Sequence, residues 1–227
     1  MKIIVLSGAG ISAESGIKTF RDADGLWEGH DVMQVASPQG WQANRNLVLD
    51  FYNQRRKQLL EVKPNKAHIV LAELESQHDV HIVTQNVDDL HERAGSSQVL
   101  HLHGELFKVR SEGNPSDIKE WKKDLNAGDK CALGHQLRPH IVWFGEAVPM
   151  LEKAAEIVSQ GEVLVIVGTS LQVYPAAGLI SYAPESAKVY YLDPKPFISR
   201  ELSMREHKLI PKLATEGVLE LVEILTS

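Results

Sequence analysis

The chain has 227 residues, of which 43% are hydrophobic and 24% charged, and its formal net charge is -6. That length fits a single domain with a small insert, and the composition supports a packed core. Surfaces that follow a phosphate backbone carry an excess of Lys and Arg, so an acidic balance argues against nucleic acid as a partner.

Cysteine usage and the absence of targeting signals predict where the protein works. Cys131 is the only cysteine, so no intramolecular disulfide can form, which fits a reducing compartment. The chain begins directly in strand-like sequence without the features of a signal peptide. No apolar run approaches the roughly 20 residues of a membrane span. We expect a soluble, cytoplasmic monomer that does not bind membranes.

Short apolar runs alternate with helical patterns along the chain. Runs rich in Val and Ile predict buried parallel strands at residues 2–7, 80–84, 162–168 and 188–192. Helical patterns cover residues 44–62 and 65–77. This order predicts a Rossmann-like α/β fold, with a parallel sheet and helices on both faces.

The first strand runs into GAGISA, where Gly8 and Gly10 would let the backbone approach a pyrophosphate and Ala13 takes the third small position. A dehydrogenase would continue to a second strand that ends in an acidic ribose ligand. Here a loop follows instead, and it places Phe20 and Arg21 near the reactive half of a dinucleotide. This pattern favours chemistry on the bonds of the dinucleotide itself.

Two segments interrupt the alternation. Residues 21–42 have the composition of a loop, and residues 105–139 are polar around a possible helix at 116–125. We expect one domain over residues 1–227, with a small lobe built from inserts at about 22–62 and 105–139.

Five blocks, in order along nearly the whole chain, resemble the sirtuin family. They are GAGISAESGIKTFRDADGLW, TQNVDDLHERAG, LHLHGELF, PHIVWFGEAVP and VGTSLQVYPAAGL. The resemblance implies an NAD-dependent protein lysine deacylase, with acyl-lysine proteins as substrates. In the implied reaction the acyl oxygen attacks the nicotinamide ribose and nicotinamide leaves. A base then activates a ribose hydroxyl, which captures the acyl carbon and yields O-acyl-ADP-ribose and free lysine.

The resemblance gives His103 the role of the base, since an imidazole titrates near neutral pH. Asn86 is the second catalytic candidate, because it would hold the ribose and its water. A histidine is commonly a satisfied core residue, and we interpret His101 in that way.

The implied cofactor contacts come from four regions of the chain. Asp88 would hold the carboxamide, although it could also cap the helix that follows. The full set is Gly8, Ala9, Gly10, Ser12, Ala13, Phe20, Arg21, Trp27, Gln85, Asn86, Asp88, Gly168, Thr169, Ser170 and Ala214.

The closest resemblance is to the branch that removes acidic acyl groups. Tyr52 and Arg55 lie three residues apart on a predicted helix, and a guanidinium fork with a phenol matches a carboxylate. Small Ala36 would face the acyl group. Val142, Phe144 and Gly145 would flank the acyl-lysine by strand addition.

The sequence departs from the family at two places. Many sirtuins hold a zinc ion with two Cys-x-x-Cys pairs, but this region contains only Cys131, and Ser111 stands where a first ligand would be. We predict no metal, with the lobe stabilised by Trp121 and Leu125 on a helix. Tyr191 also stands where the family has an adenine-ribose asparagine, followed by Asp193.

Three other functions stay open from the sequence. The same loop would serve an NAD glycohydrolase or ADP-ribosyltransferase, which would consume NAD without an acyl-lysine. A non-catalytic NAD-binding module would bind NAD without turnover. A dehydrogenase is disfavoured by the missing acidic ribose ligand.

Overall fold

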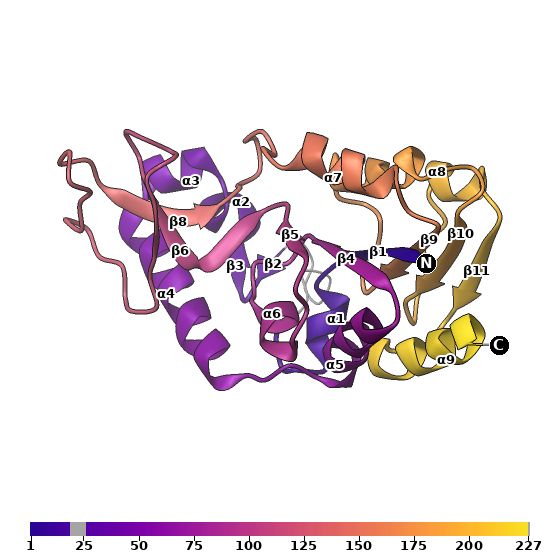
Figure 1. The fold of residues 1–227 in the computed structure, drawn as a ribbon. Helices are drawn as coiled ribbons and strands as arrows, with labels where there is room; N and C mark the ends of the chain where they lie inside the picture. Colours follow the sequence, from indigo (N-terminus) through magenta and orange to yellow (C-terminus); the bar gives the residue numbers. More distant parts are fainter. Residues whose placement is uncertain (19–25, 227) are drawn as a thin grey trace.

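The computed structural model describes residues 1–18 and 26–226. Its centre is a six-stranded parallel sheet in the order β11-β10-β9-β1-β4-β5 (Figure 1). The strands are β1 Lys2–Ser7, β4 Asp79–Thr84, β5 Val99–His101, β9 Val163–Val167, β10 Lys188–Leu192 and β11 His207–Ile210. All four strands expected from the apolar runs are present in this sheet.

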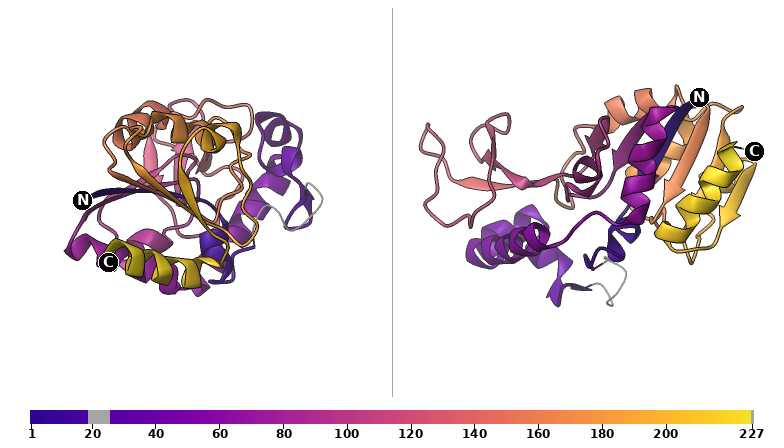
Figure 2. Two further views of the ribbon diagram at one scale, coloured as in Figure 1. Left: turned by 90° about the vertical axis from the view of Figure 1, so that its right-hand side faces the viewer. Right: turned by 60° about the horizontal axis from the view of Figure 1, so that its bottom comes forward.

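Helices cover both faces of the sheet, which explains why its strands are apolar throughout (Figures 1 and 2). Ile3 and Val5 of β1 face the cluster that includes α5 and α9, whereas Ile4 and Leu6 face the cluster that includes α7 and α8. The helices of this domain are α1 Gly10–Ala13, α5 Lys66–Glu73, η1 Leu74–Ser76, α6 Leu90–Ala94, α7 Leu151–Val158, η2 Ala176–Tyr182, α8 Arg200–Ser203 and α9 Ala214–Thr226.

A smaller lobe lies beside the sheet and has its own hydrophobic cluster, which includes Trp41, Phe51 and Trp143 (Figure 1). Its elements are β2 Leu26–Trp27, β3 His30–Asp31, α2 Val32–Val35, α3 Pro38–Ala43, α4 Arg45–Glu61, β6 Gly104–Ser111, β7 Ile118–Glu120 and β8 Leu137–Ile141. Strands β7, β6 and β8 form a three-stranded antiparallel sheet. Described residues from 35–59 and from 106–143 therefore share one hydrophobic cluster.

The predicted helix at 116–125 is wrong. Residues 118–120 instead pair with β6 as strand β7, and the amide of Trp121 donates to the carbonyl of Phe107 at 2.6 Å. The indole of Trp121 donates to the carbonyl of Asp124 at 3.1 Å, and Leu125 is fully buried. The backbone here takes its hydrogen bonds from a neighbouring strand, which a short polar sequence cannot reveal.

The loop predicted over residues 21–42 is also wrong in its described part, which contains two short helices. The Asp31 carboxylate accepts from the amide of Met33 and caps α2. The Ser37 hydroxyl accepts from the amide of Gly40 and caps α3, whose first residue is Pro38. Ser-Pro is a helix-start signal that the abundance of Gly and Pro concealed.

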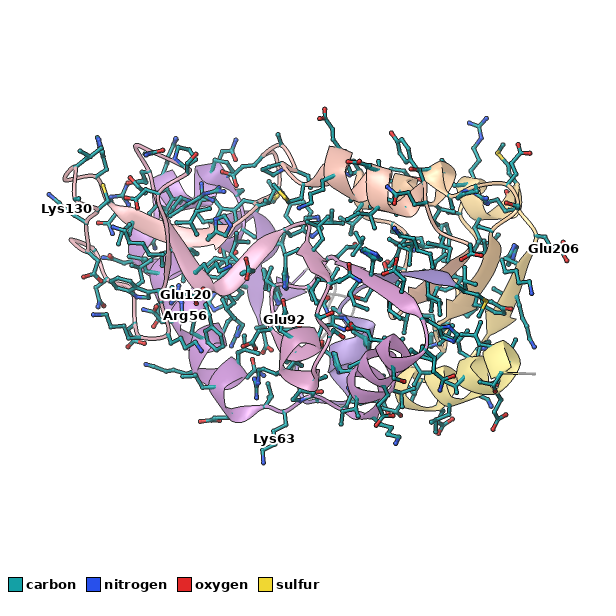
Figure 3. All side chains as sticks on the ribbon, in the orientation of Figure 1. Arg56, Lys63, Glu92, Glu120, Lys130 and Glu206 are labelled. Atoms are coloured by element: carbon teal, nitrogen blue, oxygen red, sulfur yellow. The ribbon has the colours of Figure 1, made fainter. Side chains whose placement is uncertain are left out.

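Charged side chains lie mainly at the periphery. Figure 3 shows Lys63, Lys130 and Glu206 extending away from the ribbon, and all three are exposed. Among the described residues, no helix has the length and apolar character to cross a bilayer.

Candidate functional site

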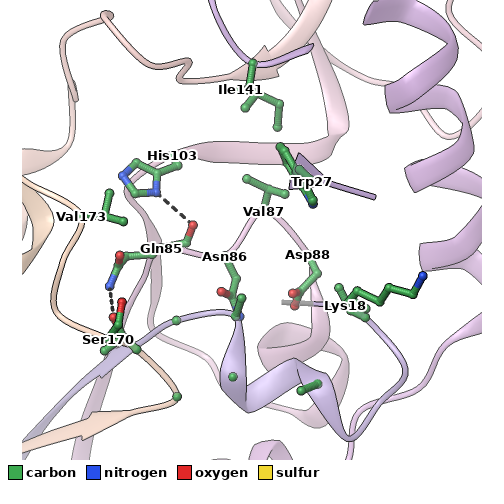
Figure 4. A pocket seen from close by; sticks show the side chains of 18 of the residues that line it. Lys18, Trp27, Gln85, Asn86, Val87, Asp88, His103, Ile141, Ser170 and Val173 are labelled. Carbon is green, nitrogen blue, oxygen red and sulfur yellow. Dashed lines mark hydrogen bonds between the residues drawn. The ribbon is translucent and has the colours of Figure 1, made fainter. Parts of the chain in front are cut away.

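A cavity of about 590 Å³ lies between the two lobes, at the carboxyl ends of β1, β4, β9 and β10 (Figure 4). Ligands bind at this edge in doubly wound sheets. The predicted residues that line it are Gly8, Ala9, Gly10, Ala13, Trp27, Ala36, Tyr52, Arg55, Gln85, Asn86, Asp88, His103, Val142, Phe144, Gly145, Gly168, Thr169, Ser170 and Ala214. Ser12 is not on the lining, and Phe20 and Arg21 lie outside the described residues.

Glycines allow the loops after β1 and β9 to touch. The amide of Gly10 donates to the carbonyl of Gly168 at 2.7 Å. A Cβ at Gly10 would lie 2.7 Å from the Gly168 Cα, and Gly168 itself has φ +62°. Helix α1 has only four residues, so its dipole is small. The glycines instead let the two loops pack closely and leave backbone groups exposed.

Ser12 acts behind the cavity wall. Its hydroxyl donates to Asp88 Oδ2 at 3.0 Å and accepts from Asn86 Nδ2 at 3.2 Å. The other Asp88 oxygen accepts from the amide of Leu90, the first residue of α6, at 3.2 Å, although the N-cap position itself is Asp89. Burial raises the pKa of Asp88 to about 6, although the bonds from Leu90 and Ser12 oppose the rise.

His103 is oriented by one backbone bond. Its Nδ1 lies 3.0 Å from the carbonyl of Gln85, as the dashed line in Figure 4 shows. A carbonyl can only accept, so Nδ1 carries the proton and the Nε2 lone pair is left to accept one. Burial lowers the pKa of His103, and the bond to Gln85 opposes this only in part, so the ring is mainly neutral near pH 7.

His101 differs from His103 although it is only two residues away. Its Nδ1 lies 2.8 Å from the carbonyl of Asn86 and its Nε2 2.7 Å from Glu92 Oε1, so both nitrogens have partners. It does not line the cavity.

At the end of β9, Thr169 is fixed from both sides. Its hydroxyl accepts from Gln85 Nε2 at 3.1 Å, and its carbonyl accepts from the Tyr191 hydroxyl at 2.8 Å. Tyr191 is fully buried and is not among the lining residues, so it supports the loop from behind. Asp193 does line the cavity, and its carboxylate accepts from the amide of Lys195 at 2.9 Å.

The small lobe contributes Tyr52 and Arg55 from α4. Tyr52 is fully buried, and its hydroxyl accepts from Trp143 Nε1 at 3.0 Å. The Arg55 guanidinium lies 5.0 Å from the centre of the Phe51 ring, and its buried Nε has no acceptor among the described residues. Burial lowers the pKa of Arg55, and the charge of Glu28 opposes that shift.

The segment after β8 is a turn rather than a strand, and this limits the predicted strand addition. The amide of Val142 donates to the carbonyl of His103 and that of Phe144 to the carbonyl of Ala36, both at 2.9 Å. The amide of Trp143 donates to Glu146 at 2.8 Å. Since these three amides are engaged inside the chain, a substrate peptide would have to use other groups of this segment.

A model of the Sir2 family matches residues 8–175. The chain belongs to the Sir2 family. Two of its relatives are named NAD-dependent protein deacylase. The one from Helicobacter pylori strain 26695 is 67% identical over 193 residues, which cover 85% of this chain and 84% of the relative. The one from Bacteroides thetaiotaomicron is 56% identical over 229 residues, which cover 98% of this chain and 97% of the relative.

Solved structures agree with this placement in the Sir2 family. The crystal structure of a Sir2 homologue in complex with NAD has a TM-score of 0.87 and 37% identity, covering 99% of this chain and 89% of the other. A Sir2 homologue mutant in complex with ADP-ribose also has a TM-score of 0.87, with 35% identity and coverage of 99% and 93%. The Rossmann-like fold predicted from the sequence is confirmed.

Ser111 and Cys131, in the region expected to lack zinc, contact each other. The Ser111 hydroxyl lies 3.3 Å from Cys131 Sγ, and both residues are buried. No group of three or more His, Cys, Asp or Glu side chains close enough to hold a metal occurs in the part of the chain that the structure describes.

Sequence reasoning missed several lining residues. Glu28 and Glu146 bring negative charge to the cavity, and Lys18 and Lys195 bring positive charge. Glu146 follows Trp143 inside the WFGE block, so the signal was present in the motif. Lys195 follows Asp193 in a loop with no such signal.

Proposed function

We propose that this Sir2-family chain is an NAD-dependent protein lysine deacylase that acts on acidic acyl groups such as succinyl and malonyl, and also on acetyl. The main observation in support is that Tyr52 and Arg55 line the same cavity as His103. A guanidinium and a phenol in an apolar setting favour a carboxylate, because charge-assisted hydrogen bonds are strongest away from water.

The cavity suits NAD in size and in the nature of its wall. Exposed loop backbone at Gly8 and Gly10 permits close approach, and hydroxyl groups lie on the loop after β9. Gln85, Asn86 and Asp88 would hold the nicotinamide half, with Ser170 and Ala214 further along the wall. When bound, NAD supplies the activated ribose that accepts the acyl group.

The residues of the chain then provide positioning and proton transfer. His103 would accept a hydroxyl proton at Nε2, since Nδ1 is committed to the Gln85 carbonyl. Asn86 and Asp88 are kept in fixed orientations by Ser12. Arg55 would bind the distal carboxylate of the acyl chain, on the small-lobe side of the cavity.

The test compares one lysine peptide, succinylated or acetylated, with and without NAD, in the parent chain and in Arg55→Met. Loss of a charged hydrogen-bonding pair costs about 1.5–3 kcal/mol, so desuccinylation should fall by about 10- to 150-fold more than deacetylation. Arg45→Met is a matched control, because Arg45 also lies on α4 over an aromatic ring, 4.8 Å from the centre of Trp41, yet does not line the cavity.

Each outcome has a defined meaning. Equal loss of both activities in Arg55→Met would remove the proposed acyl preference and leave the deacylase. NAD consumption with both peptides untouched would support the glycohydrolase, and NAD binding without turnover would support the binding module.

A further inference from the structure

The indole of Trp143 donates a hydrogen bond to the hydroxyl of Tyr52, with 3.0 Å between Nε1 and Oη. The two residues are 91 positions apart: Tyr52 lies on α4 and Trp143 in the segment after β8. Tyr52 is fully buried and Trp143 is 2% exposed, and both line the cavity. This contact lies where the proposed function places the acyl group, so any role for it in acyl binding rests on that function.

The direction of this bond is fixed by chemistry. An indole nitrogen can only donate, so the phenol oxygen must be the acceptor. Burial raises the pKa of Tyr52, so the phenol keeps its single proton throughout the physiological range. No described residue accepts a hydrogen bond from the Tyr52 hydroxyl, so its proton is available to a ligand.

A partly buried ionic cluster fixes the position of Trp143. Glu146 accepts from the amide of Trp143 at 2.8 Å and from Arg138 at 2.7 Å. The guanidinium of Arg138 lies 3.4 Å from the centre of the Trp143 ring and also donates to the carbonyl of Ile141 at 3.1 Å. Arg110 donates to Glu146 at 3.1 Å. The indole is therefore held at its backbone and on one face.

Together these contacts determine which groups face an acyl chain. Arg55 has donors only, and its buried Nε has no acceptor among the described residues. The Tyr52 oxygen accepts a hydrogen bond from Trp143, and the hydroxyl proton has no acceptor among the described residues. We propose that Trp143 is a positioning residue for acyl selectivity: its N–H orients the Tyr52 hydroxyl so that Tyr52 and Arg55 present hydrogen-bond donors to the terminal carboxylate of an acidic acyl group.

A pocket built in this way distinguishes a carboxylate from its neutral isostere. A succinyl group ends in two acceptor oxygens, whereas the matching carboxamide brings N–H donors against the donors of Tyr52 and Arg55. An unmatched buried donor carries a full desolvation penalty. The parent chain should therefore process the succinyl peptide at least about tenfold better than the carboxamide analogue, measured as kcat/KM.

The sharpest perturbation replaces Trp143 by 3-(3-benzothienyl)alanine, which keeps both fused rings and exchanges the N–H for sulfur. Trp143→Phe is a second variant, which needs only standard amino acids. The ratio of kcat/KM for succinyl to acetyl peptide should fall by about tenfold, mainly through KM, and the affinity for the succinyl peptide, measured calorimetrically, should fall in parallel. Trp121→Phe is the matched control: its indole donates to the carbonyl of Asp124, and it does not line the cavity.

Repeating the Trp143 replacement in the Tyr52→Phe variant distinguishes a positioning role of Trp143 from a general packing role. If Trp143 acts through the Tyr52 hydroxyl, the same replacement in Tyr52→Phe should change the succinyl-to-acetyl ratio by less than about twofold, because the coupled group is already gone. An equal tenfold fall in both backgrounds would overturn the proposal.

The remaining outcomes separate the role of Trp143 from the function on which it rests. A parent chain that prefers succinyl, with a benzothienyl variant whose ratio is unchanged, would overturn the role of Trp143 alone. A parent chain without preference for succinyl would overturn the acidic-acyl function and the inference with it.

Discussion

Replacing His103 by asparagine should impair acyl transfer while sparing the release of nicotinamide. Asparagine keeps a donor that can reach the Gln85 carbonyl, now 3.0 Å from His103 Nδ1, but it lacks the basic lone pair of Nε2. In the proposed reaction nicotinamide leaves before the base acts. The variant should therefore still exchange labelled nicotinamide into NAD in the presence of an acyl peptide.

The expected size of the loss comes from the role of a general base. Positioned proton transfer contributes about 10²–10⁴-fold, so formation of O-acyl-ADP-ribose should fall within that range. At an ordinary pKa of about 6.5, roughly three quarters of the imidazole would be neutral at pH 7. Burial lowers the pKa of His103, so the neutral fraction is larger still.

The pH profile of the parent chain should report the same imidazole. The active form of His103 is neutral, so activity should be lost as pH falls through its pKa, and the midpoint should lie below about 6.5. The assay measures kcat/KM between pH 5 and 9 alongside nicotinamide exchange. His81→Asn is the control, since His81 lies on β4 beside Asp79 and outside the cavity. A midpoint above 7, or equal loss of exchange and transfer in His103→Asn, would rule out His103 as the base.

Two further predictions concern stability and metal content. The pKa of Asp88 is raised to about 6, so its ionisation lowers the free energy of unfolding as pH rises from about 4 through that value. Asp88→Asn should therefore raise the free energy of unfolding by up to about 3 kcal/mol at pH 7.5 and change it little at pH 4, while weakening NAD binding. Thermal melts at the two pH values measure this, and a stability gain no larger at pH 7.5 than at pH 4 would contradict it. Metal analysis by mass spectrometry should find far less than one zinc per purified chain, since Ser111 and Cys131 contact each other directly, and near-stoichiometric zinc would contradict this.

The parallel sheet could be predicted because each strand is buried on both faces. The run KIIVLS is apolar almost throughout, and residues 3–6 send side chains to both clusters. Helix α4 was also predicted closely, since Asn44 caps its start through a bond to the amide of Leu47 at 3.1 Å. Local signals of this kind need no knowledge of the rest of the chain.

The small lobe was harder because its structure depends on partners far along the sequence. Residues 118–120 become a strand only by pairing with β6. The acceptor for the indole of Trp143 is Tyr52, and the position of Ser12 behind the cavity depends on Asp88 and Asn86. The sequence motifs identify the residues of the site. Tertiary packing determines which of them line the cavity and which lie behind its wall.

Tyr191 departs from the family pattern and has a structural role in this fold. In the position where the resemblance expects an asparagine on the adenine ribose, its hydroxyl donates to the carbonyl of Thr169 and accepts from the amide of Phe197 at 3.2 Å. A side chain committed to those two bonds and fully buried makes no contact with the cavity. Under the proposed function, polar contacts to the adenine ribose of NAD would come from groups that do line the wall, such as the Asp193 carboxylate just after the same strand.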